Sequence, residues 1–105
     1  MDVNPSAVFA ALASAPRRRI IAFLGQTALS TADLALRFGV SAPAVSRHLS
    51  VLLAAGLVSA ERQGQRVLYR LRRDVLLDAL ARCASEVDGP LRRREPARRA
   101  PREAI

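Results

Sequence analysis

The sequence predicts a small, mainly α-helical domain that contains one two-stranded β-hairpin. Two observations support this prediction. Apolar residues recur at helical spacing in segments that begin near Ser, Asn or Pro, and one pair of β-prone runs joined by a Gly-containing loop precedes the last of them. Because the chain has only 105 residues, of which 4% are aromatic, its core must be small and aliphatic, and such a core favours an oligomer that shares it.

Two helices are predicted near the N-terminus. Residues 7–13 are apolar on nearly every side, which indicates a helix buried all round, in part by a second chain. Pro16 opens the next helix, which ends at Gly25 and turns its aliphatic residues inward. Residues 17–19 are three arginines in its first turn, at the positive end of the helix dipole. Their position predicts either a nearby anionic group or full exposure to solvent.

A capping-box pattern precedes the third helix. Ser30 and Asp33 stand three residues apart, and the helix that follows continues to Phe38 and ends at Gly39. The next helix is predicted over residues 41–55, directly after this short turn. Two helices joined by a short turn that contains Gly are typical of a helix-turn-helix unit.

The helix over residues 41–55 organises the rest of the chain. Ser41 can cap its start, Pro43 is tolerated in its first turn, and Gly56 ends it. Its predicted inner stripe consists of Val45, Leu49, Leu52 and Leu53. Its opposite face carries Pro43, Ala44 and Arg47, flanked by His48 and Ser50, with Val51 outward and Ser46 partly toward the core. A small, polar and cationic outer face of this kind suits insertion into a DNA groove.

A β-hairpin follows this helix. Residues 58–62 and 67–71 are β-prone, and the loop over residues 63–66 contains Gly. A two-stranded ribbon directly after a helix-turn-helix unit predicts a winged helix. Arg62 and Arg66 lie near the tip, where they can reach phosphates or the minor groove, and we expect Tyr69 to anchor the wing on the domain.

The last predicted helix covers residues 74–87. Its apolar seam lies beyond the winged-helix core, so a dimer built from the first and last helices is the economical arrangement. The predicted interface consists of Val8, Phe9, Leu12, Leu76, Leu80, Cys83 and Val87. Cys83 is interpreted as a small apolar filler, with an intersubunit disulfide as the alternative.

The charge of the chain indicates a polyanionic partner. The net charge is +8, with nucleic acid as the first candidate and a membrane surface as the second. We assign residues 1–88 to a DNA-binding and dimerisation domain and residues 89–105 to a basic tail that is rich in Pro and Arg. Such a tail cannot offset its ordering entropy by burial, so we expect it to be disordered, either as an arm on DNA or as a solvated tail without a role.

Three segments resemble the ArsR/SmtB family of bacterial winged-helix repressors. They are FAALASAPRRRIIAFL, STADLALRFGVSAPAVSRHLSVLLAAGLV and ERQGQRVLYRL, which lie within residues 8–71. The Gly-Gln pair at the wing and the lack of sensor cysteines make the chain similar to the metal-independent SdpR-type autorepressors. The resemblance implies a homodimer that binds an inverted-repeat operator in double-stranded DNA and blocks transcription until a signal releases it.

The chain departs from the metal-sensing members of that family. Their two cysteines at the start of the third helix correspond to Ser30 and Ala32, and the last helix lacks His. A soft metal takes three or four thiolate or imidazole ligands, whereas the chain has one Cys and one His. We therefore expect no metal and no cofactor. Ala42 stands where the family often has Gln, so the operator preference is expected to differ.

We predict DNA contacts from the recognition helix and from the wing tip. The predicted residues are Ser41, Ala42, Pro43, Ala44, Ser46, Arg47, His48, Ser50, Arg62, Gln63, Gln65 and Arg66. Two alternatives are a winged-helix module that docks an acidic protein or a membrane partner, and a nonspecific architectural DNA-binding protein. An enzyme is not indicated, because the sequence shows neither a nucleophile with a base nor a Gly-rich phosphate loop.

The expected compartment is the cytoplasm. Residues 7–15 mimic the apolar part and cleavage site of a signal peptide, but Asp2 stands where a positive charge is required and three arginines follow. No apolar run approaches the roughly 20 residues that span a bilayer, so we expect no membrane partner.

Overall fold

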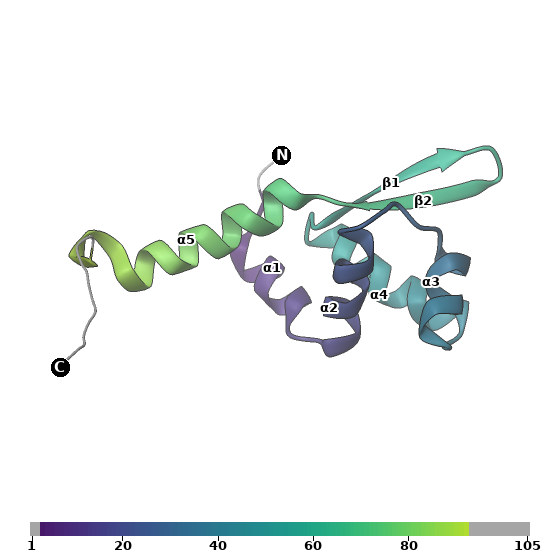
Figure 1. The fold of residues 1–105 in the computed structure, drawn as a ribbon, viewed down its shortest axis with the longest axis horizontal. Coiled ribbons are helices and arrows are strands. Elements are labelled where there is room, and N and C mark those ends of the chain that lie inside the picture. The colour runs from purple at the N-terminus through teal and green to yellow at the C-terminus, as the bar shows by residue number, and fades with distance from the viewer. Residues whose placement is uncertain (1–2, 93–105) are drawn as a thin grey trace.

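The computed structural model describes residues 3–92, with side chains for residues 3–88. Its elements follow the chain in the order α1 (Pro5–Leu12), α2 (Ala15–Leu24), α3 (Thr31–Phe38), α4 (Ala42–Ala54), β1 (Val58–Gln63), β2 (Arg66–Leu71) and α5 (Arg73–Arg92). Helices α1 to α4 form a body, from which the β-hairpin extends on one side and α5 on the other (Figure 1). The predicted fold class, a mainly helical winged helix-turn-helix, is confirmed.

Arginine side chains stabilise the corner between α1 and α2. Arg17 and Arg18 each donate a hydrogen bond of 2.7 Å, to the backbone carbonyls of Ala11 and Leu12 respectively. These carbonyls lie at the negative end of the α1 dipole, which partly offsets the unfavourable position of Arg17 and Arg18 at the positive end of the α2 dipole. Arg19 instead lies over the ring of the phenylalanine that ends α3, 4.8 Å from its centroid.

Within its own chain, helix α1 is buried on one side. Val8 and Ala11 are buried, whereas Pro5, Ser6 and Ala10 are exposed. Cover of the exposed side by a second chain stays a prediction. The assignment of Val8 to the dimer interface, however, is wrong. Its side chain is 0% exposed because the core of its own chain encloses it, and it has no surface to offer a second chain.

Helices α3 and α4 form the helix-turn-helix unit. The predicted capping box is present: Ser30 Oγ accepts a hydrogen bond from the Asp33 amide at 3.1 Å, and the Asp33 carboxylate accepts one from the Ser30 amide at 3.0 Å. Gly39 follows α3 with a φ of 70°, a left-handed conformation that strains most other residues. Ser41 Oγ accepts from the Ala44 amide at 3.3 Å and caps α4 as predicted.

The aliphatic core lies against the inner face of α4. The largest side chains that are less than 2% exposed are Val8, Ile20, Leu34, Val45, Leu49, Leu52 and Leu57. Three of the four predicted inner residues of α4 are among them. Leu53 is 37% exposed, so its assignment to the inner stripe is wrong, because one residue adds about 100° of rotation past Leu52. Burial of the inner stripe determines which residues of α4 face outward.

Strands β1 and β2 are antiparallel and form the wing. The register pairs Gln63, the last residue of β1, with Arg66, the first residue of β2. The loop therefore contains only Gly64 and Gln65, and the predicted loop over residues 63–66 is one residue too long at each end. Gly64 has a φ of 63°, which suits the first position of a two-residue hairpin loop.

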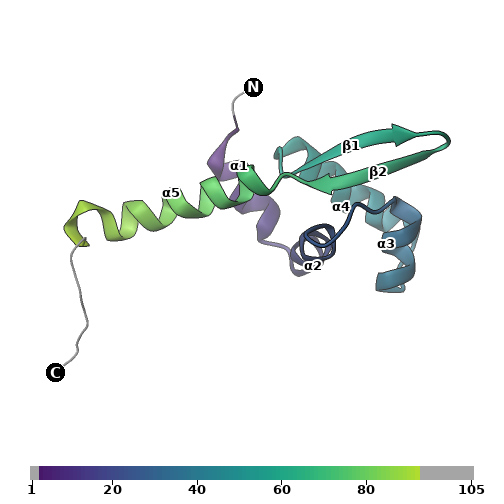
Figure 2. The ribbon, with the colours of Figure 1, turned by 45° about the horizontal axis from the view of Figure 1, so that its top comes forward.

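The free edge of β2 pairs with the segment that precedes α3. The backbones of Leu29 and Tyr69 exchange two hydrogen bonds, of 3.1 and 2.8 Å. Figure 2 shows this segment passing beneath the wing before α3 begins. The Tyr69 side chain packs against the buried core, as the predicted anchor requires. The wing is thereby joined to the helix-turn-helix unit by backbone as well as by side chains.

Helix α5 leaves the body after its first two turns. Val75 and Ala79 are buried against the core, at 8% and 5% exposure. Residues 81–88 are all exposed, and Figure 1 shows this part of α5 extending away from the other helices. A long exposed helix indicates a surface that can pack against a partner.

The predicted end of this helix at Val87 is wrong, because α5 continues to Arg92 and includes Pro90. The fixed φ of proline is compatible with a helical backbone, so the helix continues with the loss of one amide hydrogen bond. The first residues of the predicted tail are therefore helical, and residues 93–105 lie outside the described part of the chain. Among residues 3–92, we find no helix with the length and hydropathy that crossing a membrane requires.

Candidate nucleic-acid interface

Helix α4 presents a polar stripe away from the core. Its exposed members are Pro43, Ser46, Arg47 and Ser50, spaced i, i+3, i+4 and i+7. Ser46 is exposed, so the prediction that it turns partly toward the core is wrong. Ser41 and Ala42 are exposed where the helix starts, and Ala44 and His48 are half-buried beside the stripe. The structure thus brings the predicted residues of the recognition helix onto one outward face.

Arg47 is the cation of this stripe. Within the residues whose side chains are described, it makes no hydrogen bond, ion pair or ring contact. Its neighbours on the stripe, Pro43, Ser46 and Ser50, are small, so a ligand can approach the helix closely. A guanidinium with five unused donors on such a face can form a bidentate pair with a phosphate or with the edge of a guanine.

Most other arginines of residues 3–88 already have a partner in the chain. Ion pairs engage Arg66, Arg70, Arg72 and Arg82, and Arg73 donates to the carbonyl of Gly25 at 2.7 Å. Arg17, Arg18 and Arg19 are engaged as described above. Only Arg37, Arg47 and Arg62 in this part of the chain make no hydrogen bond, ion pair or ring contact. These three lie on α3, α4 and β1, the elements with which a winged helix-turn-helix contacts DNA. Unpartnered cations therefore remain where DNA contacts are expected.

Arg37 was not predicted as a site residue. It lies in the last turn of α3 and is exposed, next to the turn that leads into α4. In sequence it is one arginine among many, and what distinguishes it is that within residues 3–88 it makes no hydrogen bond, ion pair or ring contact, although its charge acts on Asp33. That signal becomes visible only when the contacts of the other arginines are known.

The wing tip is polar and exposed. Arg62, Gln63 and Gln65 are all exposed, in agreement with their predicted positions. Arg66, however, is directed toward the start of α3. One of its Nη atoms lies 2.7 Å from Asp33 Oδ2 and 3.4 Å from Ser30 Oγ. The structure therefore separates Arg62, which is unpaired, from Arg66, which is bound to the body of its own chain.

The carboxylate that holds Arg66 is kept ionised. The backbone amide and then the side chain of Ser30 lower the pKa of Asp33 below its usual value, burial partly opposes them, and the charges of Arg66 and Arg37 lower it further by smaller amounts. The hydrogen bonds and the two positive charges favour the charged carboxylate over the neutral acid. Asp33 is therefore an anion at neutral pH, with one set of hydrogen bonds to its own helix and another to the wing.

The remaining predicted interface residues lie along α1 and α5. Phe9, Leu12 and Leu76 are half-buried, whereas Leu80 is 45% and Val87 78% exposed, and Cys83 is exposed. These positions are consistent with an apolar surface that a partner could cover.

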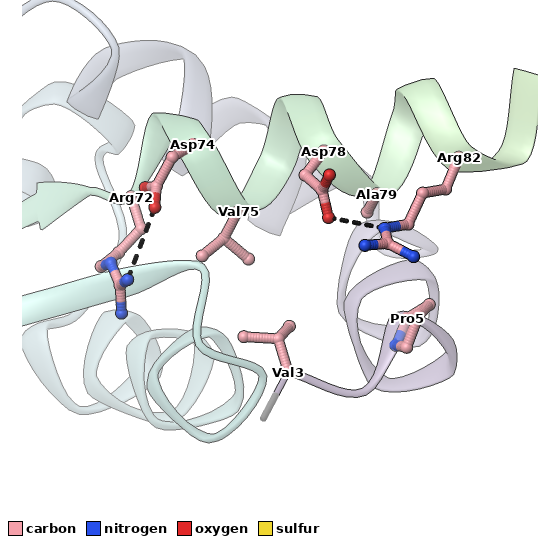
Figure 3. Close-up of a pocket in the computed structure, with 8 residues that line it drawn as sticks. All are labelled: Val3, Pro5, Arg72, Asp74, Val75, Asp78, Ala79 and Arg82. Atoms are coloured by element: carbon pink, nitrogen blue, oxygen red, sulfur yellow. Dashed lines mark hydrogen bonds and ion pairs between the residues drawn. The ribbon is translucent and has the colours of Figure 1, made fainter. Parts of the chain in front are cut away.

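A shallow pocket lies between the N-terminal segment and α5. Figure 3 shows Val3 and Pro5 opposite Val75 and Ala79, with two ion pairs on the α5 side. Arg72 lies 3.6 Å from Asp74, and Arg82 lies 2.9 Å from Asp78. Because each arginine here is matched by an aspartate, this surface offers little net charge to a polyanion, in contrast to the face formed by α4 and the wing.

The described residues contain no group of three or more His, Cys, Asp or Glu side chains that could hold a metal ion. Ser30, at one of the positions where metal sensors of the family carry Cys, acts as the N-cap of α3. Its hydroxyl is thus part of a structural hydrogen-bond network.

The second helix of the helix-turn-helix unit carries an outward, unpaired arginine, and the β-wing that follows carries another unpaired arginine. This arrangement is that of a winged helix-turn-helix DNA-binding protein. A family model described as "Bacterial regulatory protein, arsR family" matches residues 15–60. The transcriptional repressor SdpR of Bacillus subtilis (strain 168) is 36% identical over 73 residues, which cover 70% of this chain and 81% of SdpR.

Two further similarities agree with this match. The HTH-type transcriptional repressor SmtB of Mycobacterium tuberculosis (strain CDC 1551 / Oshkosh) is 38% identical over 80 residues, which cover 72% of this chain and 59% of SmtB. The homodimeric winged helix-turn-helix DNA-binding domain of Mb0332 from Mycobacterium bovis, a possible ArsR-family transcriptional regulator, superposes with a TM-score of 0.67 and 29% identity, over 87% of this chain and 86% of that one. The chain belongs to the ArsR family of bacterial transcriptional regulators. It is a DNA-binding regulator and not an enzyme.

Proposed function

We propose that the chain is a repressor that binds an inverted-repeat operator as a homodimer, with α4 in the major groove and residues 62–66 of the wing against the backbone or minor groove. The observation that carries this proposal is the distribution of unpaired arginines. Within residues 3–88, Arg37 on α3, Arg47 on α4 and Arg62 on the wing make no hydrogen bond, ion pair or ring contact, whereas the other arginines, two of them also on the wing, do. Phosphate contacts from such side chains position a protein on DNA, and base-edge contacts from α4 select the sequence.

The homodimer is supported by the surface of α5 and by a structural neighbour. The exposed apolar residues Leu80 and Val87 lie on α5, and the second half of this helix extends beyond the body (Figure 1). The Mb0332 domain, which has a similar fold, is homodimeric. A twofold arrangement places two recognition helices in successive major grooves, about 34 Å apart, which requires a near-palindromic operator.

We also propose that repression does not depend on a bound metal and that the protein acts in the cytoplasm. The ligand argument supports the first point, since one Cys and one His are too few for a soft-metal site within one chain. Addition of Zn²⁺, arsenite or Hg²⁺ at concentrations below those that precipitate the protein should leave operator binding unchanged. Release of DNA by any of these ions would contradict this part of the proposal.

The test of the main proposal is fluorescence anisotropy with DNA from upstream of the chain's own gene, measured over a range of salt concentrations. Binding should exceed that to scrambled DNA and should fall steeply as salt rises, because bound phosphates release counterions. Arg47→Ala should weaken operator binding by about 1–3 kcal/mol, which is roughly 5- to 150-fold.

Arg82→Gln is the matched control, because it removes the same charge from an exposed, already paired arginine on α5. The control should bind the operator like the parent protein, and light scattering should show both variants to be dimers. Equal affinity of the parent for operator and scrambled DNA at every salt concentration would reject sequence-specific repression in favour of an architectural role. An Arg47→Ala variant with parental affinity would reject α4 as the recognition helix.

A further inference from the structure

The outer part of the wing is joined to the body through the side chain of Arg66. Residues 59–66 are all exposed, so no packed core lies beneath the tip. The guanidinium of Arg66 crosses to α3 and bonds Asp33 Oδ2 at 2.7 Å and Ser30 Oγ at 3.4 Å. Within the wing, Arg70 on β2 bonds Glu61 on β1 at 3.4 Å, so that the two strands are also linked through side chains.

Two attachments fix the orientation of this ribbon, whereas one would leave it free to pivot. The backbone pair between Leu29 and Tyr69 is the inner attachment. Arg66 lies three residues before Tyr69 on β2, about 10 Å closer to the tip at the rise of an extended strand. Both attachments meet the same short segment of the body, since Leu29 directly precedes Ser30, the N-cap of α3. The ribbon is therefore held at two points against the helix-turn-helix unit.

The acceptors of Arg66 are held in place by contacts that do not involve the wing. Ser30 and Asp33 hold each other through the reciprocal hydrogen bonds of the capping box. Asp33 therefore presents its carboxylate at a defined place at the start of α3, with little remaining rotamer freedom to lose. An ion pair with a preorganised partner of this kind restricts the other side chain more than a pair of two mobile chains does.

We propose that Asp33 and Arg66 are positioning residues, whose ion pair fixes the wing against α3 and so determines where Arg62 stands relative to the recognition helix. In this assignment Arg66 binds Asp33 and not DNA, so the contact proposed above for residues 62–66 of the wing is narrowed to Arg62 and the neighbours that precede Arg66. The effect on DNA binding rests on the proposed function, whereas the fixing of the wing does not.

The first experiment is hydrogen exchange of the wing amides in the DNA-free protein. Asp33→Asn keeps an oxygen that can accept from the Ser30 amide but removes the charge that holds Arg66, and Arg66→Gln removes the other partner. Each should accelerate exchange of the β1–β2 amides about two- to fivefold and leave the amides of α4 unchanged. Asp33→Glu should restore slow exchange, because Glu at this position also completes a capping box and reaches Arg66. Parental exchange in Arg66→Gln would overturn the proposal.

The second experiment measures operator affinity against salt for the same variants. Asp33→Asn, Arg66→Gln and the double variant should all bind about two- to fivefold more weakly, with the slope of log affinity against log salt unchanged. The pair Asp78→Asn and Arg82→Gln, which breaks an exposed ion pair within α5, is the matched control and should have parental affinity and parental wing exchange.

A phosphate contact from Arg66 gives a different result and would overturn the proposal. Arg66→Gln would then lower the salt slope by about 0.9, and Asp33→Asn would strengthen binding by releasing Arg66. If the parent protein fails to prefer its operator, the proposed function fails, but hydrogen exchange in the absence of DNA still decides whether the ion pair fixes the wing.

Discussion

Ser30 and Ser41 cap successive helices with the same type of hydrogen bond in different surroundings. Ser30 is 7% exposed, its hydroxyl accepts from the Asp33 amide at 3.1 Å, and its own amide donates to the Asp33 carboxylate at 3.0 Å. Ser41 is exposed, and its bond from the Ala44 amide is 3.3 Å long. Ser30→Ala and Ser41→Ala therefore form a matched pair in which one buried and one exposed cap are removed.

The expected costs follow from what each replacement leaves unpaired. Ser41→Ala exposes one amide to water and should lower the free energy of unfolding by about 0.5–1 kcal/mol. Ser30→Ala leaves the Asp33 amide with less access to water and removes one acceptor of Arg66, so its cost should be about 1–2 kcal/mol. Since about 1 kcal/mol shifts the Tm of a domain of this size by roughly 4–8 °C, the two variants should be resolved in thermal unfolding.

The assay is urea and thermal unfolding followed by circular dichroism, at one fixed protein concentration because dimer dissociation contributes to the measured stability. Operator binding of both variants should be measured in parallel, because Ser41 lies at the start of the recognition helix and Ser30 does not. Of the two variants, Ser41→Ala should show the larger loss of operator affinity, and Ser30→Ala should show the larger loss of unfolding free energy. Equal destabilisation by the two replacements would refute the reasoning that burial and the reciprocal bond make the Ser30 cap stronger.

Two further predictions concern pH and the dimer. The pKa of Asp33 is lowered in the folded state, first by Ser30 and to a smaller extent by Arg66. Its contribution to the free energy of unfolding should therefore be complete above the ordinary aspartate pKa of about 3.9, and it should be lost as the pH falls through the lowered pKa of the folded state. Asp33→Asn should flatten this acidic part of the pH profile of stability, measured by urea unfolding. Leu80→Asp should give a monomer in light scattering and abolish operator binding at concentrations that saturate the parent protein. The control Ala81→Asp, about 100° further round α5, should leave the dimer intact. A dimeric Leu80→Asp variant would exclude the face of α5 that carries Leu80 as the interface.

The limits of α3 and the start of α4 could be predicted because their signals are local. The capping box of Ser30 and Asp33, the cap at Ser41 and the turn at Gly39 each depend on residues within a few positions of one another, and all are present. The hairpin was predicted for the same reason, with an error of one residue at each end of its loop. Short-range hydrogen bonding and backbone preference decide these features before any long-range contact forms.

The errors arise where a distant part of the chain decides the outcome. The sequence assigns Val8 to the dimer interface because a helix that is apolar on every side does not reveal which side packs against its own chain. Only the packing of α1 on the other helices shows that the chain itself covers Val8. Leu53 was assigned to the core because a period of 3.6 leaves the edge of an apolar stripe uncertain by one residue. In both cases the residue type is compatible with either environment, so composition and spacing alone do not choose between them.

The arginines show the same distinction for function. In sequence, a net charge of +8 carried by arginine indicates a polyanionic partner but does not say which side chains meet it. In the described part of the chain most arginines instead hold the fold together, through the carbonyls that end α1 and α2 and through aspartates on α3 and α5. What distinguishes Arg47 and Arg62 is that the chain supplies them with no acceptor in the described residues. For a protein that binds DNA, the charge still unpaired after folding, and not the total charge, therefore marks the surface that faces the DNA.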